Sequence, residues 1–442
     1  MIASPSAERL ADATVQEVAV GIIGYGIVGS GAYHILTDNA DEIAVRAGCK
    51  VRVARIADID WTRPRSCPVP PDLRTTNGAE IIDDPHIDIV IETVGGTGAA
   101  LEFVLAAIRS GKSVVTSNKE LIARHGAEVL EAAAKAEVDV GFEGAVGGTI
   151  PICRSLQEGL PANRFRRLIG ILNGTTNYML TQMTEHGVEF AQALREAQDK
   201  GFAEQDPSND VDGIDAANKI AILSAIAFRE RVPVEKIHRE GIREITPTDI
   251  RYARQLGCLI KLLAIAQRSR DGRLEVRVHP TFLPLKHPLA AVSGEYNAVF
   301  VEGDASGGVM FYGKGAGSLP TGAAVVADVI SAARNVRLGC RNRIPCVCRG
   351  VAEIKPVREC ITSHYLRMRV ADRPGVLGAA AGILGEEGVS IKSVLQVDST
   401  ASSAEIVWLT HPGLEGKLTQ ALERIRALDV VEHIAPPIRV EE

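Results

Sequence analysis

The sequence has no long hydrophobic run, and this absence excludes a membrane-spanning protein. Its longest apolar stretches, such as Ile220 to Phe228, are far shorter than the roughly 20 residues that a spanning helix needs. The mean hydropathy is only +0.08. The first residues carry acids early and no continuous apolar core, which does not resemble a secretory signal, so we expect a cytoplasmic protein.

The sequence also lacks an excess of positive charge. The formal net charge is −6, with 49 basic and 55 acidic residues. Proteins that bind nucleic acid or anionic lipid normally attract phosphate groups with a basic surface. We therefore expect no nucleic-acid or membrane partner, and the partner predicted instead is a small molecule.

The chain has too few cysteines for a fold held together by disulfide bonds. Eight cysteines occur in 442 residues, and none forms a CxxC pair. Free thiols are the preferred interpretation. Four of them lie close together in the sequence, but their spacing matches no zinc pattern, and their role stays open: Cys340, Cys346, Cys348 and Cys360.

The length of the chain allows two or three domains of roughly 150 residues each. In residues 1–146, short β-branched runs alternate with helical patterns, which is typical of βαβ units on a parallel sheet. The region is predicted to be a doubly wound α/β domain. We expect strands at 18–23, 51–57, 87–92, 113–116 and 138–142, and one helix from Ser30 to about Arg46.

The rest of the chain divides further. Residues 147–317 mix strands with long helices and are predicted to be an α+β substrate-binding and dimerisation domain, and a helix at 318–336 returns to the first domain. Residues 337–362 are expected to be a linker. Residues 363–442 follow the order βαββαβ, with a last strand at 430–440, and predict a ferredoxin-like domain.

The strongest chemical signal is the glycine-rich segment GYGIVG, in which Gly24, Gly26 and Gly29 follow the first strand. Such glycines allow a tight turn and close approach of a pyrophosphate, while the free N–H groups of Ile27 and Val28 would face its charge. The segment predicts a Rossmann-type dinucleotide site.

The ends of the next strands supply further candidates for the cofactor site. Asp58 ends the second strand, where a carboxylate would accept ribose hydroxyls and repel a 2′-phosphate, which favours NAD over NADP. Arg63 and Arg65 follow closely and could instead hold a phosphate. Thr93 is expected beside the nicotinamide ribose, and Lys119 reaches the same edge of the sheet.

One helix of the second region joins polar and apolar features. It is rich in aliphatic residues, yet it carries Asp215 and Lys219 at positions i and i+4, on one face. From the residues alone, a solvated face and a functional cleft are equally good interpretations.

Several motifs together carry a resemblance. The segments GYGIVG, SNK, FEGAVGGTIP, LNGTTNYML, KGFAEQDPSNDVDGIDAANKIAIL and GKGAGSLPTGAAVVADVI run in order from about residue 18 to 335. Together they resemble homoserine dehydrogenase. The tail resembles an ACT domain, with DRPGVL as its strand-to-helix loop.

The resemblance implies an enzyme that interconverts L-homoserine and L-aspartate 4-semialdehyde by hydride transfer with NAD or NADP, in threonine and methionine biosynthesis. Lys219 matches the catalytic lysine, read as the general acid/base, and Lys119 matches a second active-site lysine. Glu204 and Asp215 match carboxylates around the substrate. Three further residues match positions that line the substrate and cofactor sites: Thr176, Gly201 and Gly317.

The resemblance also implies a monovalent cation, sodium being favoured, held by oxygens at Glu143, Val146, Gly148 and Ile150. The ACT-like tail implies one of two roles. It binds threonine as a feedback effector at Gly375, Val376 and Leu377, or it is a dimerisation module without an effector, and a homo-oligomer is expected in both cases.

Two rival functions remain at this stage. One is a non-catalytic amino-acid sensor that keeps the dinucleotide fold for stability, and the other is a dehydrogenase of another small amino or hydroxy acid. The NGTTNY segment and the segment from Glu204 to Lys219 disfavour the second rival, and retention of both lysines argues against the first.

Overall fold

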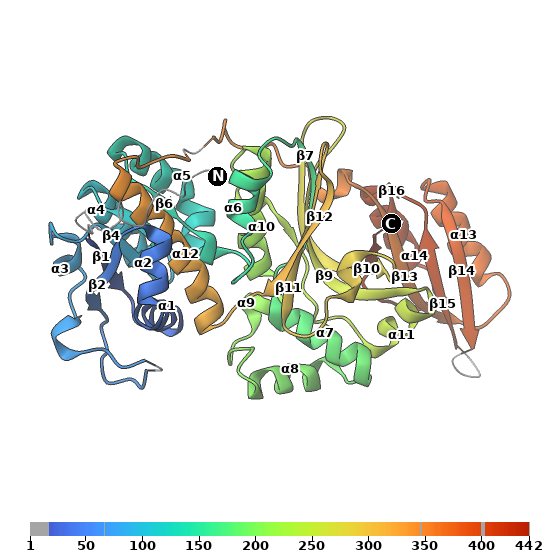
Figure 1. The fold of residues 1–442 in the computed structure, drawn as a ribbon. Helices are drawn as coiled ribbons and strands as arrows, with labels where there is room; N and C mark the ends of the chain where they lie inside the picture. The colour runs from blue at the N-terminus through green and yellow to red at the C-terminus, as the bar shows by residue number, and fades with distance from the viewer. Residues whose placement is uncertain (1–16, 66, 345–346, 399–402, 442) are drawn as a thin grey trace, which may run out of the picture. The chain divides into compact units, whose positions relative to one another are not determined.

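The structure is a computed structural model that describes residues 17–65, 67–344, 347–398 and 403–441. Contacts divide the chain into two compact units (Figure 1). Unit 1 comprises Met1–Pro161, Ala225–Arg231 and Gly313–Arg349, and unit 2 comprises Ala162–Ser224, Val232–Tyr312 and Gly350–Glu442. Each unit is described by itself below.

Unit 1 is built on a parallel sheet of six strands in the order β3-β2-β1-β4-β5-β6. The order reverses at β1, as in doubly wound folds, which confirms the predicted fold class. The strands are β1 (Glu17–Ile23), β2 (Lys50–Ala57), β3 (Arg74–Thr75), β4 (Ile89–Glu92), β5 (Ser113–Thr116) and β6 (Val140–Gly141).

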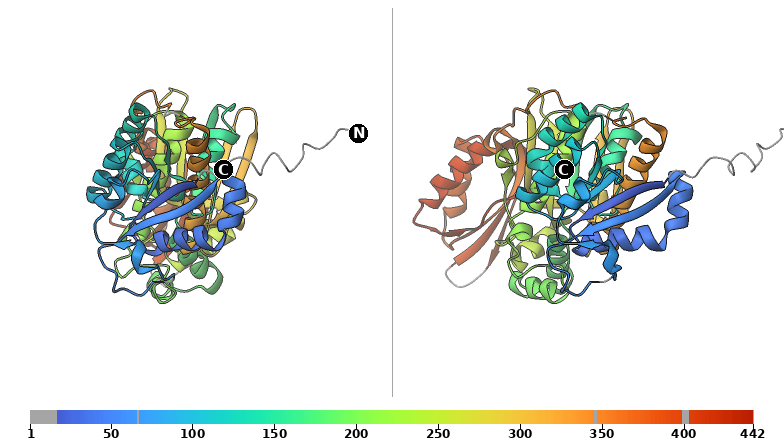
Figure 2. Two further views of the ribbon diagram at one scale, coloured as in Figure 1. Left: turned by 60° about the vertical axis from the view of Figure 1, so that its left-hand side comes forward. Right: turned by 90° about the vertical axis from the view of Figure 1, so that its left-hand side faces the viewer.

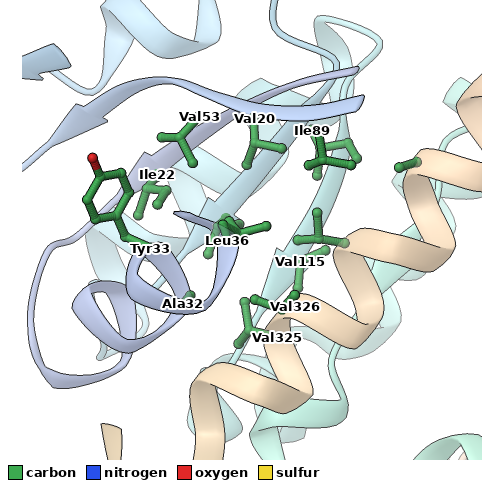
Figure 3. Packing of buried hydrophobic residues seen from close by; sticks show 14 of the residues in the cluster. Val20, Ile22, Ala32, Tyr33, Leu36, Val53, Ile89, Val115, Val325 and Val326 are labelled. Atoms are coloured by element: carbon green, nitrogen blue, oxygen red, sulfur yellow. The ribbon is translucent and has the colours of Figure 1, made fainter. Parts of the chain in front are cut away.

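Helices cover both faces of this sheet. One face packs against α1 (Ile27–Asp38), α2 (Ala40–Ala47) and α12 (Ser318–Leu338), and Figure 3 shows Leu36 of α1 and Val325 of α12 in one cluster with the strand residues Val115 and Ile89. The other face packs against α3 (Ala79–Ile82), α4 (Gly98–Arg109) and α5 (Lys119–Ala136). Burying aliphatic side chains on both faces explains why these strands read as continuous apolar runs.

The prediction of a single helix from Ser30 to Arg46 is wrong, because the structure has two helices that meet at Asn39. The Thr37 hydroxyl donates to the carbonyls of Tyr33 and His34, and the next two residues, Asp38 and Asn39, are poor helix formers. After the break, Ile43 and Ala47 of α2 are buried in the same core as α1.

Unit 2 contains a sheet of twelve strands, whose main path has the order β12-β11-β7-β9-β10-β18-β13-β15-β14. Its first part holds β7 (Phe165–Ile171), β8 (His238–Arg239), β9 (Cys258–Arg268), β10 (Leu274–Pro284), β11 (Tyr296–Gly303) and β12 (Gly307–Lys314). The accompanying helices are α7 (Gly174–His186), α8 (Phe190–Asp199), α9 (Ser208–Val211), α10 (Ile214–Phe228) and α11 (Pro247–Gln255). Residues 143–159 of unit 1 form short helical turns, including α6 (Ile152–Arg154).

The C-terminal part of unit 2 has the predicted βαββαβ order. Its elements are β13 (Ile361–Ala371), α13 (Val376–Glu386), β14 (Ile391–Asp398), β15 (Ser403–Thr410), β16 (Gly413–Leu414), α14 (Glu415–Arg426), β17 (Val431–Ile434) and β18 (Ile438–Val440). Figures 1 and 2 show α13 and α14 on one face of the strands, where their apolar side chains enclose the fully buried Trp408.

The prediction of one continuous strand at 430–440 is also wrong, since the structure has two separate strands there, β17 and β18. Both pieces pair with β13. Pro436 and Pro437 separate them, and a proline has no N–H to donate to a neighbouring strand. After the break, β18 also pairs with β10, so this short strand joins the ACT-like strands to the rest of the sheet.

Within the described part of the chain, no helix combines the length and the apolar character needed to cross a membrane.

Candidate functional site

The glycine-rich turn of unit 1 has the geometry of a pyrophosphate cradle. Gly24 has φ +96°, and a Cβ there would lie 2.7 Å from the backbone of Thr93. A Cβ at Gly29 would lie 2.2 Å from the Gly24 carbonyl oxygen, whereas Gly26 faces open space. Gly26 caps α1 without a side-chain hydrogen bond, and no side chain of the described residues accepts the N–H groups of Ile27 and Val28. These features fit the phosphates of a dinucleotide.

Two hydroxyl groups fix this turn. Thr93 donates to the Gly24 carbonyl at 2.7 Å, and Ser318 donates to the Ile27 carbonyl at 2.8 Å. Gly317 precedes Ser318 with φ +126°, a conformation that favours glycine. Gly317 therefore lies at the entrance to α1, beside the other candidates for the cofactor site.

Asp58 holds three groups at the end of β2. Its carboxylate accepts the N–H groups of Tyr25, at 2.7 Å, and Asp60, at 2.9 Å. It also forms an ion pair with Arg65 at 3.1 Å, and both side chains are largely buried, at 11% and 17% exposed. A carboxylate has about four lone-pair sites, so one remains for a ribose hydroxyl.

Lys119 is half-buried at the first position of α5. The preceding residue, Asn118, caps the helix by accepting the N–H of Leu121 and donates from its amide to the Gly96 carbonyl at 2.7 Å. Asn118 thereby links the start of α5 to the loop after β4, which sets the position of Lys119.

Glu92 precedes Thr93 and is fully buried, and the sequence analysis gave its carboxylate no separate role. Its carboxylate accepts the hydroxyl of Thr116 at 2.6 Å and the N–H of Val94 at 2.7 Å, which ties the ends of β4 and β5 together. Burial raises the pKa of this carboxyl, and these hydrogen bonds oppose the shift. The signal in the sequence was an acid at the end of the apolar strand IVIE.

The segment expected to hold a cation is buried and rich in turns. The Glu143 carboxylate accepts the N–H groups of Cys153 and Arg154, both at 2.8 Å, so its side chain caps the following helical turn. The pKa of Glu143 is raised to about 7, mainly by burial and to a smaller extent by the negative charge of Asp328. The carbonyl oxygens of Val146 and Gly148 accept no hydrogen bond from the described residues. Carbonyl oxygens of this kind suit a hard cation.

In unit 2, Lys219 and Asp215 lie on the same face of α10. The lysine Nζ donates to an Asp215 oxygen at 2.7 Å and to the Leu172 carbonyl at 2.8 Å. Asp215 is 2% exposed and Lys219 is 8% exposed. A solvated helix face would leave both groups in water, so the structure decides for a buried pair.

Asn173, which our sequence analysis did not select, connects this pair to its neighbours. Its amide donates to Asp215 at 2.9 Å and to Asp210 at 2.7 Å. Its side-chain oxygen accepts both the N–H of Thr176, at 2.8 Å, and the Thr176 hydroxyl, at 2.9 Å. Thr176 is thus joined to the Lys219 cluster through Asn173. The signal in the sequence that could have identified Asn173 is an asparagine between a predicted strand and the start of a helix.

Glu204 and Gly201 lie on an exposed loop. Gly201 has φ +72°, and the Glu204 carboxylate makes no hydrogen bond or ion pair with Asp215 or Lys219. The Thr175 hydroxyl donates to the Phe202 carbonyl at 2.7 Å, which ties this loop to the start of α7. The structure therefore brings Thr176, Asp215 and Lys219 into one cluster and leaves Glu204 outside it.

In the C-terminal part, Gly375 has φ +92° and caps α13. Val376 is buried, whereas Leu377 is 37% exposed. The glycine permits the sharp turn into the helix, and no atom lies within 4 Å of a Cβ built there.

The cysteines show no metal or disulfide chemistry in the parts of the chain that the structure describes. Cys340, Cys348 and Cys360 form no disulfide bond, nor do the four described cysteines before them. No group of three metal-ligating side chains occurs among the same residues. Cys346 lies outside the described residues.

A parallel sheet with this glycine turn, together with a buried lysine–aspartate pair in a second unit, is the arrangement of a dinucleotide-dependent oxidoreductase. Three family models match the chain: the NAD-binding domain of homoserine dehydrogenase over residues 24–143, homoserine dehydrogenase over 151–330 and the ACT domain over 364–430. The chain belongs to the homoserine dehydrogenase family, and it is an oxidoreductase with a nicotinamide dinucleotide cofactor and a C-terminal ACT domain.

Relatives support this assignment along almost the whole chain. A homoserine dehydrogenase from Synechocystis sp. is 43% identical over 431 residues, which cover 96% of this chain and 99% of the relative. The crystal structure of a homoserine dehydrogenase from Thiobacillus denitrificans is similar with a TM-score of 0.90 and 42% identity, covering 97% and 99%. A hyperthermophilic archaeal homoserine dehydrogenase in complex with NADPH is similar with a TM-score of 0.61 and 27% identity, covering 72% and 98%.

Proposed function

We propose that Lys219 is the general acid/base of a reversible oxidation of L-homoserine to L-aspartate 4-semialdehyde. The observation that carries the proposal is the buried cluster in which Lys219 lies 2.7 Å from Asp215 and 2.8 Å from the Leu172 carbonyl. These two contacts hold the amine in one place, which is what proton transfer at a defined substrate atom requires.

A bound nicotinamide would supply the hydride acceptor for C4 of homoserine. Lys219 as the neutral amine takes the proton of the C4 hydroxyl, and it returns that proton in the reverse reaction. Asp215 holds the resulting ammonium. Glu204, Thr176 and Gly201 are proposed to bind the substrate, and Lys119 to serve the same reaction.

For the cofactor, we propose Gly24, Gly26, Ile27, Val28 and Gly29 as the phosphate-binding turn. Asp58, Thr93, Lys119, Gly201 and Gly317 complete the proposed set. NAD is the proposed preference, because Asp58 retains room for a ribose hydroxyl and its charge opposes a 2′-phosphate.

A monovalent cation, sodium in the first instance, is proposed at the oxygens of Glu143, Val146, Gly148 and Ile150. Since the Glu143 carboxylate already caps a helical turn, its backbone oxygen is the proposed ligand. The carbonyl oxygens of Val146 and Gly148, which accept no hydrogen bond from the described residues, support this proposal, whereas the Ile150 carbonyl already accepts the N–H of Ile152 at 2.7 Å.

For the domain organisation, we propose a dinucleotide-binding domain at 1–146 with the helix at 318–336, a substrate and dimerisation domain at 147–317, a linker at 337–362 and a regulatory domain at 363–442.

Threonine is the proposed effector, at Gly375 to Leu377, and the proposed assembly is a homo-oligomer. A cytoplasmic location stays a prediction from the sequence.

The test is the initial rate of NAD and NADP reduction by L-homoserine, with sodium present, for the native chain and for Lys219→Ala. We expect the substitution to lower kcat by a factor of about 10² to 10⁴, the usual contribution of a positioned acid/base. Lys236→Ala, at an exposed position of the same unit, is the matched control. Wild-type kcat in a folded Lys219→Ala protein would disprove the role of Lys219. Addition of L-threonine to the same assay tests the proposed effector.

A further inference from the structure

Unit 2 contains a cavity with a volume of about 390 Å³, and none of the residues of the Lys219 cluster lines it. It lies where β18 joins β10 to β13, and its walls come from the start of β9, the ends of β10 and β15, and the residues around Ser363 and Val440. This volume is at the small end of the range of ligand sites, roughly 300 to 1,000 Å³. The cavity therefore suits a ligand the size of a small metabolite.

Two exposed lysines line this cavity. Lys286 follows β10 and Lys392 lies on β14, and neither makes a hydrogen bond or an ion pair with any residue that the structure describes. The one acid in the wall, Glu441, is already paired with Arg167, at 2.7 Å between the guanidinium and the carboxylate. The walls therefore carry a surplus of positive charge, which attracts an anion.

A buried hydroxyl adds a directed donor. Thr410 is 3% exposed and lines the cavity. Its oxygen accepts the N–H of His364 at 2.9 Å, while its own O–H has no acceptor among the described residues. A buried O–H without an acceptor costs free energy that a ligand oxygen would recover.

The rest of the wall is largely apolar, which suits a small ligand with an apolar part. Phe282 and Leu409 contribute apolar surface, and Cys258 contributes a thiol. Burial raises the pKa of the Cys258 thiol, and the charge of Lys392 opposes that shift, which places the ammonium within electrostatic range of this wall. The thiol is neutral at neutral pH, so it adds no negative charge that would repel an anion.

We propose that this cavity binds a small carboxylate anion, held by Lys286, Lys392 and the hydroxyl of Thr410. The site differs from the effector loop at Gly375 and adds a second binding function to the chain. A bound ligand would connect β9, β10, β14 and β15, so it would stabilise unit 2 by mass action.

The test is isothermal titration calorimetry with the full chain at constant ionic strength. L-threonine, L-aspartate, succinate and inorganic phosphate are the probes, which separate amino acids from simple dicarboxylates and from anions in general. The double variant Lys286→Gln/Lys392→Gln removes the charges, and Lys236→Gln/Lys417→Gln removes two exposed lysines of unit 2 outside the cavity.

We expect at least one carboxylate probe to bind saturably and to bind at least tenfold more weakly to the cavity variant, with the control variant unchanged. Thr410→Val should weaken the same probe by a smaller factor. Equal binding to both double variants would overturn the proposal, and so would weak binding of all four probes without preference, which would mean an adventitious ion only. Homoserine oxidation by the cavity variant, measured in parallel, is independent of this outcome, so failure here leaves the proposed activity standing.

Discussion

At the scale of single residues, the side chains that matter serve several partners at once. Asp58 holds two backbone N–H groups and Arg65, and Asn173 joins two carboxylates to a helix start. Because each such residue has nearly all its hydrogen-bonding sites in use, a substitution changes several distances together.

The pair of Asp58 and Arg65 makes a prediction about the cofactor. Asp58→Asn removes the charge that repels a 2′-phosphate, so the ratio of kcat/KM for NADP to that for NAD should rise roughly tenfold, equivalent to about 1.4 kcal/mol. Arg65→Gln removes the cation nearest this carboxylate, and the ratio should fall. Both ratios come from initial rates with homoserine.

Arg63→Gln is the matched control for this prediction. Its side chain is 69% exposed and pairs with Asp60 instead of Asp58. Equal ratios in all three variants would show that Asp58 and Arg65 do not decide between the two cofactors.

Asn173 makes a second prediction at this scale. Asn173→Ser keeps a side chain that can cap α7 but is too short to reach both Asp210 and Asp215. We expect kcat to fall roughly tenfold to a hundredfold while the unfolding midpoint stays close to that of the native chain. Asn173→Ala should lower kcat similarly and, in addition, cost about 1 kcal/mol of stability through the lost cap.

The exposed Asn209→Ala serves as the control for both Asn173 variants. A native kcat in Asn173→Ser would mean that the bridge between the two carboxylates does not position Lys219.

At the scale of elements, a buried polar network joins α11 to the ACT strands. Asp249 is 2% exposed and caps α11 together with Thr246. It accepts Arg367 of β13 at 2.8 Å and the Tyr365 hydroxyl at 3.1 Å. Arg367 also pairs with Glu405 of β15 at 3.2 Å. The network fixes the register of α11 against two strands, because a shift of one residue would leave buried charges unpaired.

The corresponding prediction is that Asp249→Asn destabilises unit 2 by roughly 3 kcal/mol, since breaking a buried ion pair leaves the arginine charge uncompensated. Urea unfolding followed by Trp408 fluorescence measures the effect, with Trp61→Phe as the background so that one tryptophan reports. Asp271→Asn, in an exposed turn that pairs with Arg273, is the control and should leave the midpoint unchanged. An unchanged midpoint for Asp249→Asn would mean that the network contributes nothing to stability.

At the scale of the whole molecule, the chain forms two units with separate cores, and unit 2 contains two deeply buried histidines. Burial lowers the pKa of His364 to about 4, and the facing charges are those of Glu415, Arg439, Glu240 and Arg277. Burial also lowers the pKa of His279 well below its usual range. Both histidines are therefore neutral in the folded protein at neutral pH.

These pKa values predict a loss of stability on acidification. Below pH 6.5 the unfolded chain binds protons at both histidines, whereas the folded chain does not bind one at His364 until about pH 4. The free energy of unfolding should fall by about 1.4 kcal/mol per pH unit for each histidine across this window. His364→Gln should remove one of the two contributions, and the exposed His433→Gln should remove neither.

The measurement is the urea midpoint of unit 2 at several pH values between 7 and 5, read from Trp408. A slope that is the same in the native chain and in His364→Gln would contradict the assignment of this pH dependence to His364.

The sequence by itself determined the class of the fold, the family and the ACT domain. Strand–helix alternation, the GYGIVG turn and the segments around NGTTNY are local patterns, and local sterics and periodicity decide them. The sequence also placed Asp215 and Lys219 on one helix face, because a spacing of four needs only helix geometry.

Only the tertiary structure decided what local patterns leave open. Asn173 meets Asp215 across 42 residues of sequence, Asp249 meets Arg367 across 118, and the break at Pro436 and Pro437 lets β18 pair with β10. The sequence left the face of α10 undecided between solvent and a cleft, and the structure shows that Asp215 and Lys219 are buried. Contacts between residues distant in sequence depend on how whole elements pack, and no short-range pattern encodes that packing.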